Sequence, residues 1–351
     1  MKTYLDKNVY EAALERIAYC FQEFDNVLVA FSGGKDSGVL LNLCYNYADE
    51  HGLLDKLTMY HLDYEAQYQM TTEYVTRTFL EQFPGIRKMW YCVPIKAQSA
   101  CALGEPYWTP WDAAKKKLWV RAMPENPYVV HEGNLDVPFR HGMVDYEFQD
   151  KLSRHFAKKR GTTAVMVGLR ADESLNRYAA VARGKKRRSY EGRKWITQTS
   201  AVTANVYPLY DWRVSDIWTA TARFGFDYNR LYDLLYQAGL TAGQMRVASP
   251  FNDCAQESLK LYKVIDPSNW ARMIGRVNGV NFTGLYGGTT AMGWKTIKLP
   301  PGHTWKSYYE FLLSTMDART AAHYNNILEK SKRYWICLLY TSPSPRDISG
   351  S

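Results

Sequence analysis

The chain has 351 residues, 46% of them hydrophobic and 23% charged, which is the balance of a globular protein and excludes a disordered tail protein or a collagen-like fibre. Lys and Arg (44) outnumber Asp and Glu (35), and the formal net charge of +9 favours anionic partners without choosing one. No apolar run approaches the ~20 residues that cross a bilayer, the first residues lack a signal-peptide pattern, and the six cysteines form no CxxC pair. We therefore expect a soluble, cytoplasmic protein with reduced thiols and no membrane partner.

Strands and helices are predicted to alternate along the first two thirds of the chain. Helical spacing covers residues 9–24, 39–49, 71–82 and 145–159. Short apolar runs of the kind that buried parallel strands use cover residues 26–31, 57–62, 87–93, 163–169 and 205–209. Strands separated by helices imply right-handed βαβ units. The sequence thus predicts an α/β fold with a doubly wound, parallel, five-stranded sheet.

The domain organisation is predicted from breaks in this alternation. Residues 1–240 form the nucleotide-binding domain, and the Pro-rich residues 94–144 are a long insertion in it, either a lid or a packed element. Residues 241–336 form a mainly helical C-terminal domain. Residues 337–351 begin with CLLYTSPSPRD, which resembles a translated sequencing adapter, so we expect the natural chain to continue differently after Ile336.

The strongest functional signal is the SGGKDS loop, residues 32–37, between the first strand and the next helix. Gly33 and Gly34 allow a tight turn that aims successive N–H groups into one concavity, while Lys35 adds a positive charge. The hydroxyls of Ser32 and Ser37 are further donors, and the helix that follows presents its positive end. Asp36 would repel a phosphate unless a cation lies between them, which argues for Mg²⁺ held by Asp36. The loop is not the GxxxxGK[ST] loop of kinases and GTPases.

The SGGKDS loop resembles the pyrophosphate loop (PP-loop) of the ATP pyrophosphatase superfamily. The chain is most similar to the phosphoadenosine phosphosulfate reductase-like branch, whose fold is that of the adenine nucleotide alpha hydrolases. The segments HLD at 61–63, VGLRADESLNR at 167–177 and YPLYDWRVSDIW at 207–218 also match motifs of that branch. The resemblance spans about residues 8–240. It implies a loop that holds the β- and γ-phosphates of ATP while the α-phosphate is attacked.

The resemblance also supplies candidate site residues. It implies that Lys35 and Asp36 serve catalysis, and that the nucleotide is further contacted by residues at the ends of the second and fourth strands: Asp63, Gly168, Arg170, Glu173 and Arg177. Asp172 or Glu173 would orient an arginine, hold a metal or contact a ribose, and the sequence does not separate these roles. Trp212 and Trp218 are expected in the core rather than in the site.

The absence of paired cysteines reduces the number of activities that the chain could have. Reductases of the family use a C-terminal cysteine, some with cysteine pairs for an iron–sulfur cluster, whereas the matching region here offers only Cys254. We therefore expect no reductase activity and no iron–sulfur cluster. Cys92 and Cys101 lack the spacing and histidines of a zinc site, so we expect no zinc.

The start of the chain and its helical C-terminal part resemble the immunoglobulin-binding regulator A-type proteins, which implies a ParB-like protein partner and a role in transcriptional co-activation. Three hypotheses remain open. The first is an enzyme that binds Mg²⁺ and ATP and attacks the α-phosphate. The second is a nucleotide-responsive regulator that acts with the ParB-like partner, or on nucleic acid through the basic run from Arg183 to Lys194, unless that run is only a solvated loop. Thiolation of a nucleic-acid base is the least favoured, because the paired cysteines are absent.

Overall fold

The structure is a computed structural model, which describes residues 6–102, 104–182, 189–252, 255–287, 289 and 299–339. The chain folds into two compact units, Met1–Met292 and Gly293–Ser351. Among the described residues, no helix is long and apolar enough to cross a membrane. Residues 183–188 of the basic run, Cys254 and most of the adapter-like tail lie outside the described residues.

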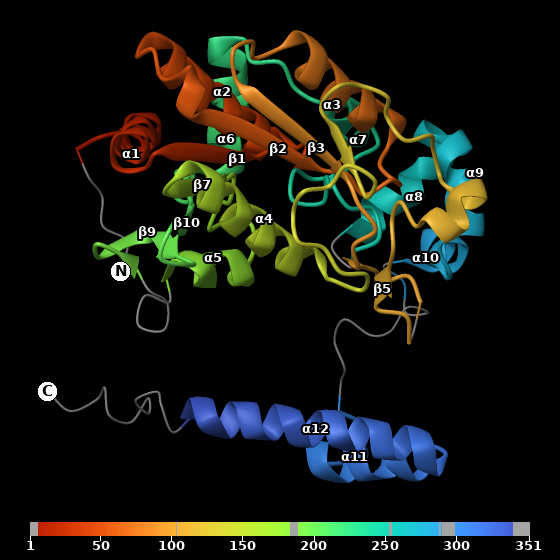
Figure 1. Ribbon diagram of the computed structural model, residues 1–351. Helices are drawn as coiled ribbons and strands as arrows, with labels where there is room; N and C mark the ends of the chain where they lie inside the picture. Colours follow the sequence, from red (N-terminus) through yellow and green to blue (C-terminus); the bar gives the residue numbers. More distant parts are fainter. Residues whose placement is uncertain are drawn as a thin grey trace, which may run out of the picture. The chain divides into compact units, whose positions relative to one another are not determined.

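The first unit is built on one eight-stranded sheet with the order β6-β3-β2-β1-β7-β10-β9-β8 (Figure 1). The strands are β1 (Asn26–Ala30), β2 (Leu57–Leu62), β3 (Arg87–Cys92), β6 (Val129–His131), β7 (Thr163–Val167), β8 (Ser189–Tyr190), β9 (Arg193–Gln198) and β10 (Thr203–Val206). Neighbours from β6 to β10 pair in parallel, while β9 and β8 are antiparallel. A separate two-stranded ribbon joins β4 (Ala97–Gln98) to β5 (Tyr107–Trp108).

Helices cover both faces of this sheet. The helices of the first unit are α1 (Val9–Glu23), α2 (Lys35–Glu50), α3 (Gln69–Glu81), α4 (Asp145–Arg160), α5 (Leu175–Ala182), α6 (Val214–Phe224), α7 (Leu231–Gln237), α8 (Gln256–Ile265), α9 (Pro267–Arg276) and α10 (Val280–Tyr286), with short 3-10 turns η1 (Leu54–Lys56) and η2 (Ala113–Leu118). Successive side chains of a strand point to opposite faces. In β1, Val27 and Val29 accordingly pack with α1, α2, α3 and α6, whereas Leu28 packs with α4.

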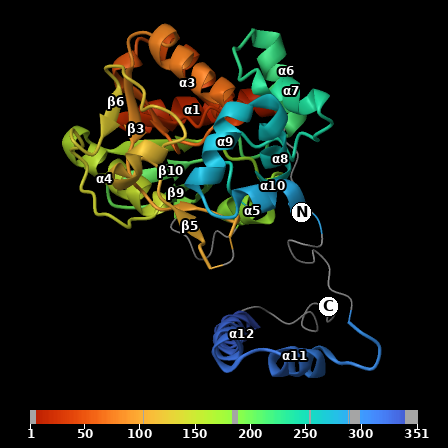
Figure 2. The same cartoon turned by 90° about the vertical axis from the view of Figure 1, so that its right-hand side faces the viewer.

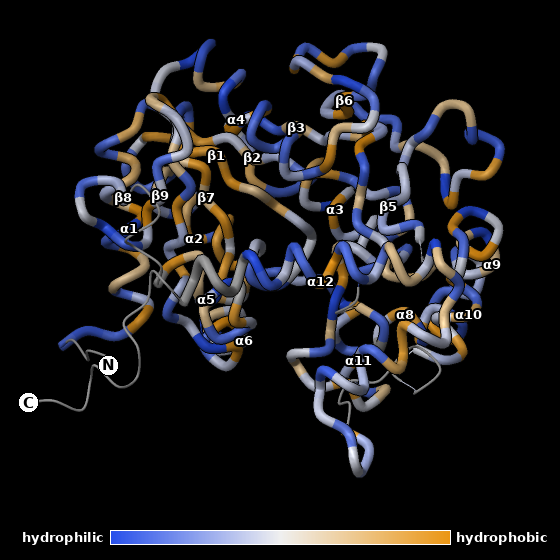
Figure 3. Tube along the Cα trace, turned by 90° about the horizontal axis from the view of Figure 1, so that it is seen from below, coloured by the Kyte–Doolittle hydropathy of each residue, from blue (hydrophilic) through white to orange (hydrophobic). Residues whose placement is uncertain are grey.

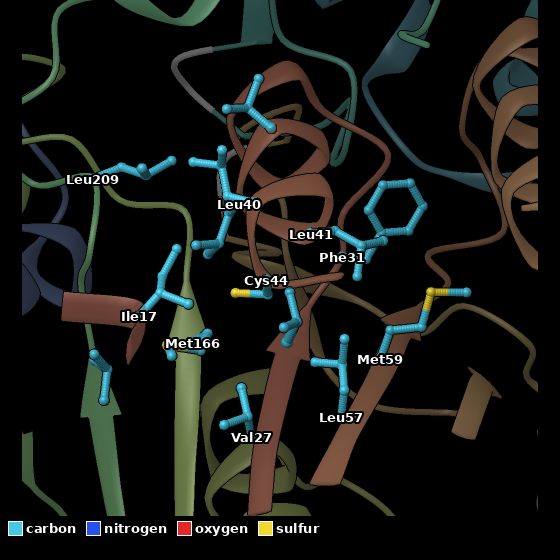
Figure 4. Close-up of a cluster of buried hydrophobic side chains, with 14 of the residues drawn as sticks. Ile17, Val27, Phe31, Leu40, Leu41, Cys44, Leu57, Met59, Met166 and Leu209 are labelled. Carbon is cyan, nitrogen blue, oxygen red and sulfur yellow. The ribbon is translucent and has the colours of Figure 1, made fainter. Parts of the chain in front are cut away.

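The core between α2 and the sheet consists of buried apolar side chains. Figure 4 shows Leu40, Leu41 and Cys44 of α2 above Val27, Leu57 and Met166 of the sheet. The hydropathy colouring places apolar residues along β1 and β7, near the middle of the unit (Figure 3). This burial fixes the ends of β1 and β7, from which the candidate site is built.

The predicted fold class is confirmed, and all five predicted strands lie in the parallel part of the sheet. The count of five was too small, because β6, β9 and β8 extend the two edges. β6 is only three residues long, and although Val129 and Val130 favour a strand, so short a run within the Pro-rich insertion does not predict one. β8 and the first residues of β9 lie within the basic run and form an antiparallel hairpin, whose charged residues lack the apolar pattern of a buried strand.

A second core joins the insertion to the helices that follow residue 230. Trp108 and Val120 of the insertion pack with apolar residues of α7, α8 and α9, among them Leu235, Leu259 and Met273. Figure 2 shows α8, α9 and α10 side by side. The insertion is thus a packed element rather than a free lid. Helices α8–α10 belong to the first compact unit, while the domain boundary proposed near residue 240 stays a prediction.

In the described residues of the second unit, the chain forms α11 (Trp305–Ser314) and α12 (Ala318–Leu339). Thr304 caps α11 by accepting from the backbone N–H of Ser307 at 3.1 Å. The two helices contact each other, and the hydroxyl of Tyr309 donates to the side-chain oxygen of Asn325 at 2.6 Å.

Candidate functional site

The SGGKDS loop lies where the winding of the sheet changes direction. The chain leaves β1 toward β2 on one side, and β7 lies on the other side of β1. The last residues of the two strands, Ala30 and Val167, pair directly, so the loops that follow them meet at one edge. Such a crevice outside the carboxyl ends of parallel strands is the usual ligand site of open α/β sheets.

The loop is shaped by its glycines and by its own hydroxyls. Gly33 has a φ of +75°, a left-handed conformation that favours glycine, and Gly34 is the N-cap of α2. The hydroxyl of Ser37 donates to the carbonyl of Gly34 at 3.0 Å and accepts from the N–H of Ser32 at 3.1 Å. The loop therefore closes on itself and leads directly into the first turn of α2, whose N–H groups have no partner within the helix.

His61 of β2 fixes the entry to this loop. Its Nδ1 lies 2.8 Å from the carbonyl oxygen of Phe31, the residue directly before the loop. Burial lowers the pKa of His61, so the ring is neutral at physiological pH and its Nδ1–H donates to that carbonyl. The histidine is a structural residue at the base of the site.

The loop after β7 approaches the SGGKDS loop without space for a side chain. A Cβ atom on Gly168 would lie 2.9 Å from the carbonyl carbon of Asp36 and 2.9 Å from the backbone nitrogen of Ser37. Only glycine allows this approach. The two loops predicted to share the nucleotide are thus brought into backbone contact.

Arg170 and Asp36 join the two loops electrostatically. The guanidinium of Arg170 is hydrogen-bonded to the carboxylate of Asp36 and also to Asp172, and Nζ of Lys35 lies 3.1 Å from Asp36. Burial opposes ionisation of Asp36, but Lys35 and Arg170 outweigh it and hold the pKa of this carboxyl below its ordinary value. The carboxylate is therefore charged at neutral pH.

A second charged group lies in the same loop. Glu173 has an almost fully buried side chain, 6% exposed, and it pairs with Arg177 one helical turn later at 2.6 Å. Arg246 reaches Glu173 from the segment between α7 and α8. Of the predicted arginines, Arg170 and Arg177 both lie at the crevice, and each is paired with a carboxylate in this structure.

Residues after α6 cover the loop, and no sequence pattern had indicated them. The backbone N–H of Lys35 donates to the hydroxyl of Tyr232 at 3.2 Å, and the carboxamide of Asn229 donates to the carbonyl of Gly33 at 3.3 Å. Burial, with a contribution from the Asp36 charge, raises the pKa of Tyr232, so its hydroxyl stays protonated. A phosphate approaching the start of α2 would meet this hydroxyl.

Asp63 lies apart from these loops. Its side chain is fully buried, and both of its oxygens lie 2.6 Å from the guanidinium of Arg121 in the insertion. The indole of Trp90 donates to the same carboxylate at 2.7 Å. A role of Asp63 in nucleotide binding stays a prediction, and in this structure its carboxylate serves to hold the insertion.

The residues of the segment after β10 take structural positions. Trp212 is buried, as predicted, and its indole donates to the carbonyl of Val9 at 2.9 Å. Trp218 packs edge-to-face on Tyr228 and Tyr232. Asp216 caps α6 by accepting from the N–H of Arg213.

The donor set of the loop fits a magnesium ion that keeps water and phosphate ligands. Mg²⁺ commonly takes one or two protein carboxylates and completes its shell with phosphate oxygens and water. Asp36 offers one ionised carboxylate, which Lys35 and Arg170 contact in this structure, and the same loop carries the hydroxyls of Ser32 and Ser37. Among the described residues, no three His, Cys, Asp or Glu side chains gather as a ready-made metal site.

Comparison with known proteins identifies the class that this geometry indicates. Residues 26–238 match the Phosphoadenosine phosphosulfate reductase domain, and residues 239–338 match the Domain of unknown function (DUF3440). The chain belongs to the phosphoadenosine phosphosulfate reductase-like family of PP-loop, nucleotide-binding proteins. The predicted superfamily is thereby confirmed, whereas the resemblance to immunoglobulin-binding regulator A-type proteins stays a prediction.

One curated relative covers most of the chain. The chain is 35% identical over 327 residues to the "Uncharacterized protein YbdN" of Escherichia coli K12, an alignment that spans 92% of this chain and 79% of the relative. Among solved structures, a phosphoadenylyl-sulfate reductase from Candida auris is 14% identical, with a TM-score of 0.37 over 70% of this chain and 96% of that chain. An FMN adenylyltransferase from Candida glabrata is also 14% identical, with a TM-score of 0.37 over 66% and 64% of the two chains.

Proposed function

We propose that this protein binds Mg²⁺ and ATP at the SGGKDS loop and transfers the adenylyl group to an acceptor, with release of pyrophosphate. The observation that supports this most directly is the juxtaposition of Lys35 and Asp36 at the start of α2, opposite Arg170 at the end of β7. A buried lysine, an ionised carboxylate and an arginine at a helix N-terminus form a site for a phosphate chain with an accompanying cation.

In this proposal the loop binds the phosphates that leave. The N–H groups at the start of α2 and the ammonium of Lys35 hold the β- and γ-phosphates. Magnesium, when bound at Asp36, supplies positive charge for the developing pyrophosphate. Arg170 carries a charge that can be shared between its carboxylate partners and a phosphate oxygen, which is the preorganised electrostatic stabilisation that phosphate chemistry uses most.

The proposed reaction is a substitution at the α-phosphorus. An oxygen of the acceptor forms a bond to the α-phosphorus, and the bond from that phosphorus to the bridging oxygen of the β-phosphate breaks. The electron pair of the broken bond leaves with pyrophosphate, and the acceptor carries AMP. No electron transfer is involved, so the proposal requires no redox cofactor.

A second candidate is a nucleotide-responsive regulator without catalysis, acting with a ParB-like partner. The observation that favours it is the closed state of the site, where Tyr232 accepts from the loop N–H of Lys35 and Asp36 is held by Arg170. Nucleotide binding would then have to open contacts with the segment that contains α7. A regulator must change its conformation when its ligand binds, and opening these contacts would be such a change.

The deciding experiment uses ATP labelled at the α-phosphate, with Mg²⁺ and with or without cell extract. We expect labelled AMP or a labelled adduct from the wild-type protein and its loss, by at least about a hundredfold, in Lys35→Ala and Asp36→Ala, because removal of one charge-stabilising group commonly costs 10²–10³. Asp49→Ala, an exposed aspartate near the other end of the same helix, is the control and should keep full turnover.

The two candidates give different results. Turnover that persists in Lys35→Ala or Asp36→Ala, with folding intact, would reject adenylyl transfer at this loop. ATP binding to the wild-type protein without any cleavage, and loss of that binding in Lys35→Ala, would instead support the regulator. Absence of ATP binding by calorimetry would reject both.

A further inference from the structure

A large open groove lies between the insertion and α9, and the site at the SGGKDS loop does not use it. Its volume is about 1010 Å³, and its lining consists of residues from 116 to 134 and from the first half of α9. Small-molecule sites commonly measure about 300–1,000 Å³, so this groove is large for a single small ligand. Its size and openness suit an elongated molecule.

The groove is basic. Lys116, Lys117, Arg121 and Arg272 line it against one carboxylate, Glu125. Within the described part of the chain, no carboxylate lies within ion-pair distance of Lys116, Lys117 or Arg272, although surface lysines and arginines elsewhere are often paired. The three charges are therefore available to an anionic partner.

Arg121 gives a second, independent indication of a ligand. Its side chain is only 9% exposed, and Asp63 and the ring of Trp111 hold it in place. Its Nε–H is buried and has no hydrogen-bond acceptor among the described residues. Buried polar groups are almost always hydrogen-bonded, so a buried donor in a basic groove indicates a missing acceptor. A phosphate oxygen would supply one.

Trp119 adds a flat, fixed aromatic surface. Its indole N–H donates to the carbonyl of Asp112 at 2.9 Å, and its ring is perpendicular to that of Trp111, with centroids 5.1 Å apart. Nζ of Lys116 lies over the ring, 5.7 Å from its centroid, so a stacked base would take the place of this ammonium. The ring is only partly buried and lines the groove. Positive charges that follow a backbone, combined with an aromatic ring on which a base can stack, are the features of single-strand nucleic-acid binding.

We propose that this groove binds single-stranded nucleic acid, with phosphates at Lys116, Lys117, Arg121 and Arg272 and a base stacked on Trp119. None of the residues of the SGGKDS loop lines the groove. The inference is thus independent of the proposed ATP chemistry, and it does not rely on the basic run that begins at Arg183.

The test measures fluorescence anisotropy of a labelled oligothymidylate of about 12 nucleotides, within the ~4–16 nucleotides that single-strand sites cover. We expect binding at about 50 mM salt that weakens with salt, with a log–log slope of about −0.7 per phosphate contacted. The double variant Lys117→Glu with Arg272→Glu should lose at least about tenfold in affinity and flatten the slope. Trp119→Leu should lose about fivefold or more if a base stacks on the ring.

Matched controls separate the groove from general basicity. Lys115→Glu changes the same charge in the same lysine run, but Lys115 does not line the groove, and Lys158→Glu changes an exposed lysine on α4. Both should bind the oligonucleotide within about twofold of the wild type. Urea unfolding of every variant confirms that it is folded.

Several results would overturn the proposal. They are absence of binding by the wild-type protein at low salt, equal loss in the groove variants and in Lys158→Glu, and unchanged binding in the double variant. Equal or tighter binding of heparin fragments, of blunt duplex DNA or of an oligoglutamate would show that charge alone, or another class of partner, occupies the groove. Tighter binding of the single strand, lost in the groove variants, would support it.

Discussion

Two regions of this molecule pair arginines with carboxylates in different ways. At the end of β2, Asp63 and Glu65 are fully buried and are held by Arg121 and Arg276, whose side chains are 9% and 2% exposed. At the SGGKDS loop, Asp36 is 15% exposed and shares its charge between Lys35 and Arg170. The carboxylates are sealed in one place and partly exposed in the other, while the cations are buried in both.

In the buried region, backbone N–H groups also donate to a carboxylate. Glu65 accepts from the N–H of Trp111 at 2.6 Å and of Val120 at 3.0 Å, in addition to Arg276. The carboxylate thereby joins β2, the insertion and α9 into one body. A buried pair is stable only when such additional hydrogen bonds offset the cost of desolvation, and this one has them.

At the SGGKDS loop, a ligand could replace the present partners of the carboxylates. Its carboxylates have arginine and lysine partners on long side chains, and Asp36 has no backbone donor among the described residues. An anionic ligand with its own cation can replace these partners without leaving a buried charge unpaired. The comparison therefore predicts that equal substitutions in the two regions have unequal effects on stability and on binding.

The largest expected change in the free energy of unfolding comes from substitution of Glu65. Glu65→Gln removes the charge that compensates buried Arg276, and breaking such a pair costs about 3–5 kcal/mol in the free energy of unfolding. Asp36→Asn, the same kind of change at the loop, should cost less, about 1.5–3 kcal/mol, because Asp36 is partly exposed and Arg170 keeps Asp172 as a second partner. Urea denaturation with a fixed m-value measures both.

Exposed Glu81 at the end of α3 supplies the control for this pair of variants. Glu81→Gln should change the free energy of unfolding by no more than about 0.5 kcal/mol. If Asp36→Asn destabilises the protein as much as Glu65→Gln does, the distinction between a sealed region and an exchangeable one fails.

An intermediate effect is expected where the two loops of the site touch. Gly168→Ala places a methyl group 2.9 Å from backbone atoms of Asp36 and Ser37, which cannot yield as a flexible side chain would. Overpacking of this kind costs about 1–3 kcal/mol, and it should push the loops apart and weaken ATP binding about tenfold or more. Calorimetric titration with ATP and urea unfolding test the two consequences separately.

Gly243→Ala is the matched control, because a Cβ atom there meets nothing within 4 Å. It should leave ATP affinity within about twofold of the wild type. Normal ATP affinity in Gly168→Ala would mean that the contact between the loops does not position the nucleotide.

The parts of this site that could be predicted are those written in short stretches of sequence. Gly33, Gly34 and Lys35 indicate an anion site because a strand, a tight turn and a helix follow one another within a few residues. Arg170 follows the strand that pairs with β1, so parallel topology alone brings it to the same edge. A local pattern was sufficient for the loop, whereas Arg170 was supplied by the family resemblance, and the sheet topology explains its place.

The remainder depends on packing between distant segments. Tyr232 and Arg246 reach the site because α7, α8 and the insertion share a second core, and no local pattern reports which distant helix covers a loop. Asp63 was expected to contact the nucleotide because of the family resemblance, and that role stays a prediction. Its pairing with Arg121 was not foreseen, because the sequence did not indicate the path of the insertion.

The smallest expected effect concerns the hydroxyl of Tyr232. It accepts from the Lys35 N–H, one of the donors that the proposed function assigns to the phosphates, so a bound nucleotide must replace this hydrogen bond. A net hydrogen bond contributes about 0.5–1.5 kcal/mol, and Tyr232→Phe should therefore tighten ATP binding by about twofold to tenfold. Calorimetry at fixed Mg²⁺ measures the change.

Tyr228→Phe provides the comparison, because that hydroxyl pairs with Asp233, outside the loop, and its loss should leave ATP affinity unchanged. Weaker ATP binding in Tyr232→Phe would contradict the prediction and would show that the protonated hydroxyl donates to the nucleotide instead of occupying its place. In that case α7 would form part of the binding site. Tighter binding would mean that α7 restrains the loop, and that the energy of nucleotide binding is partly used to release it.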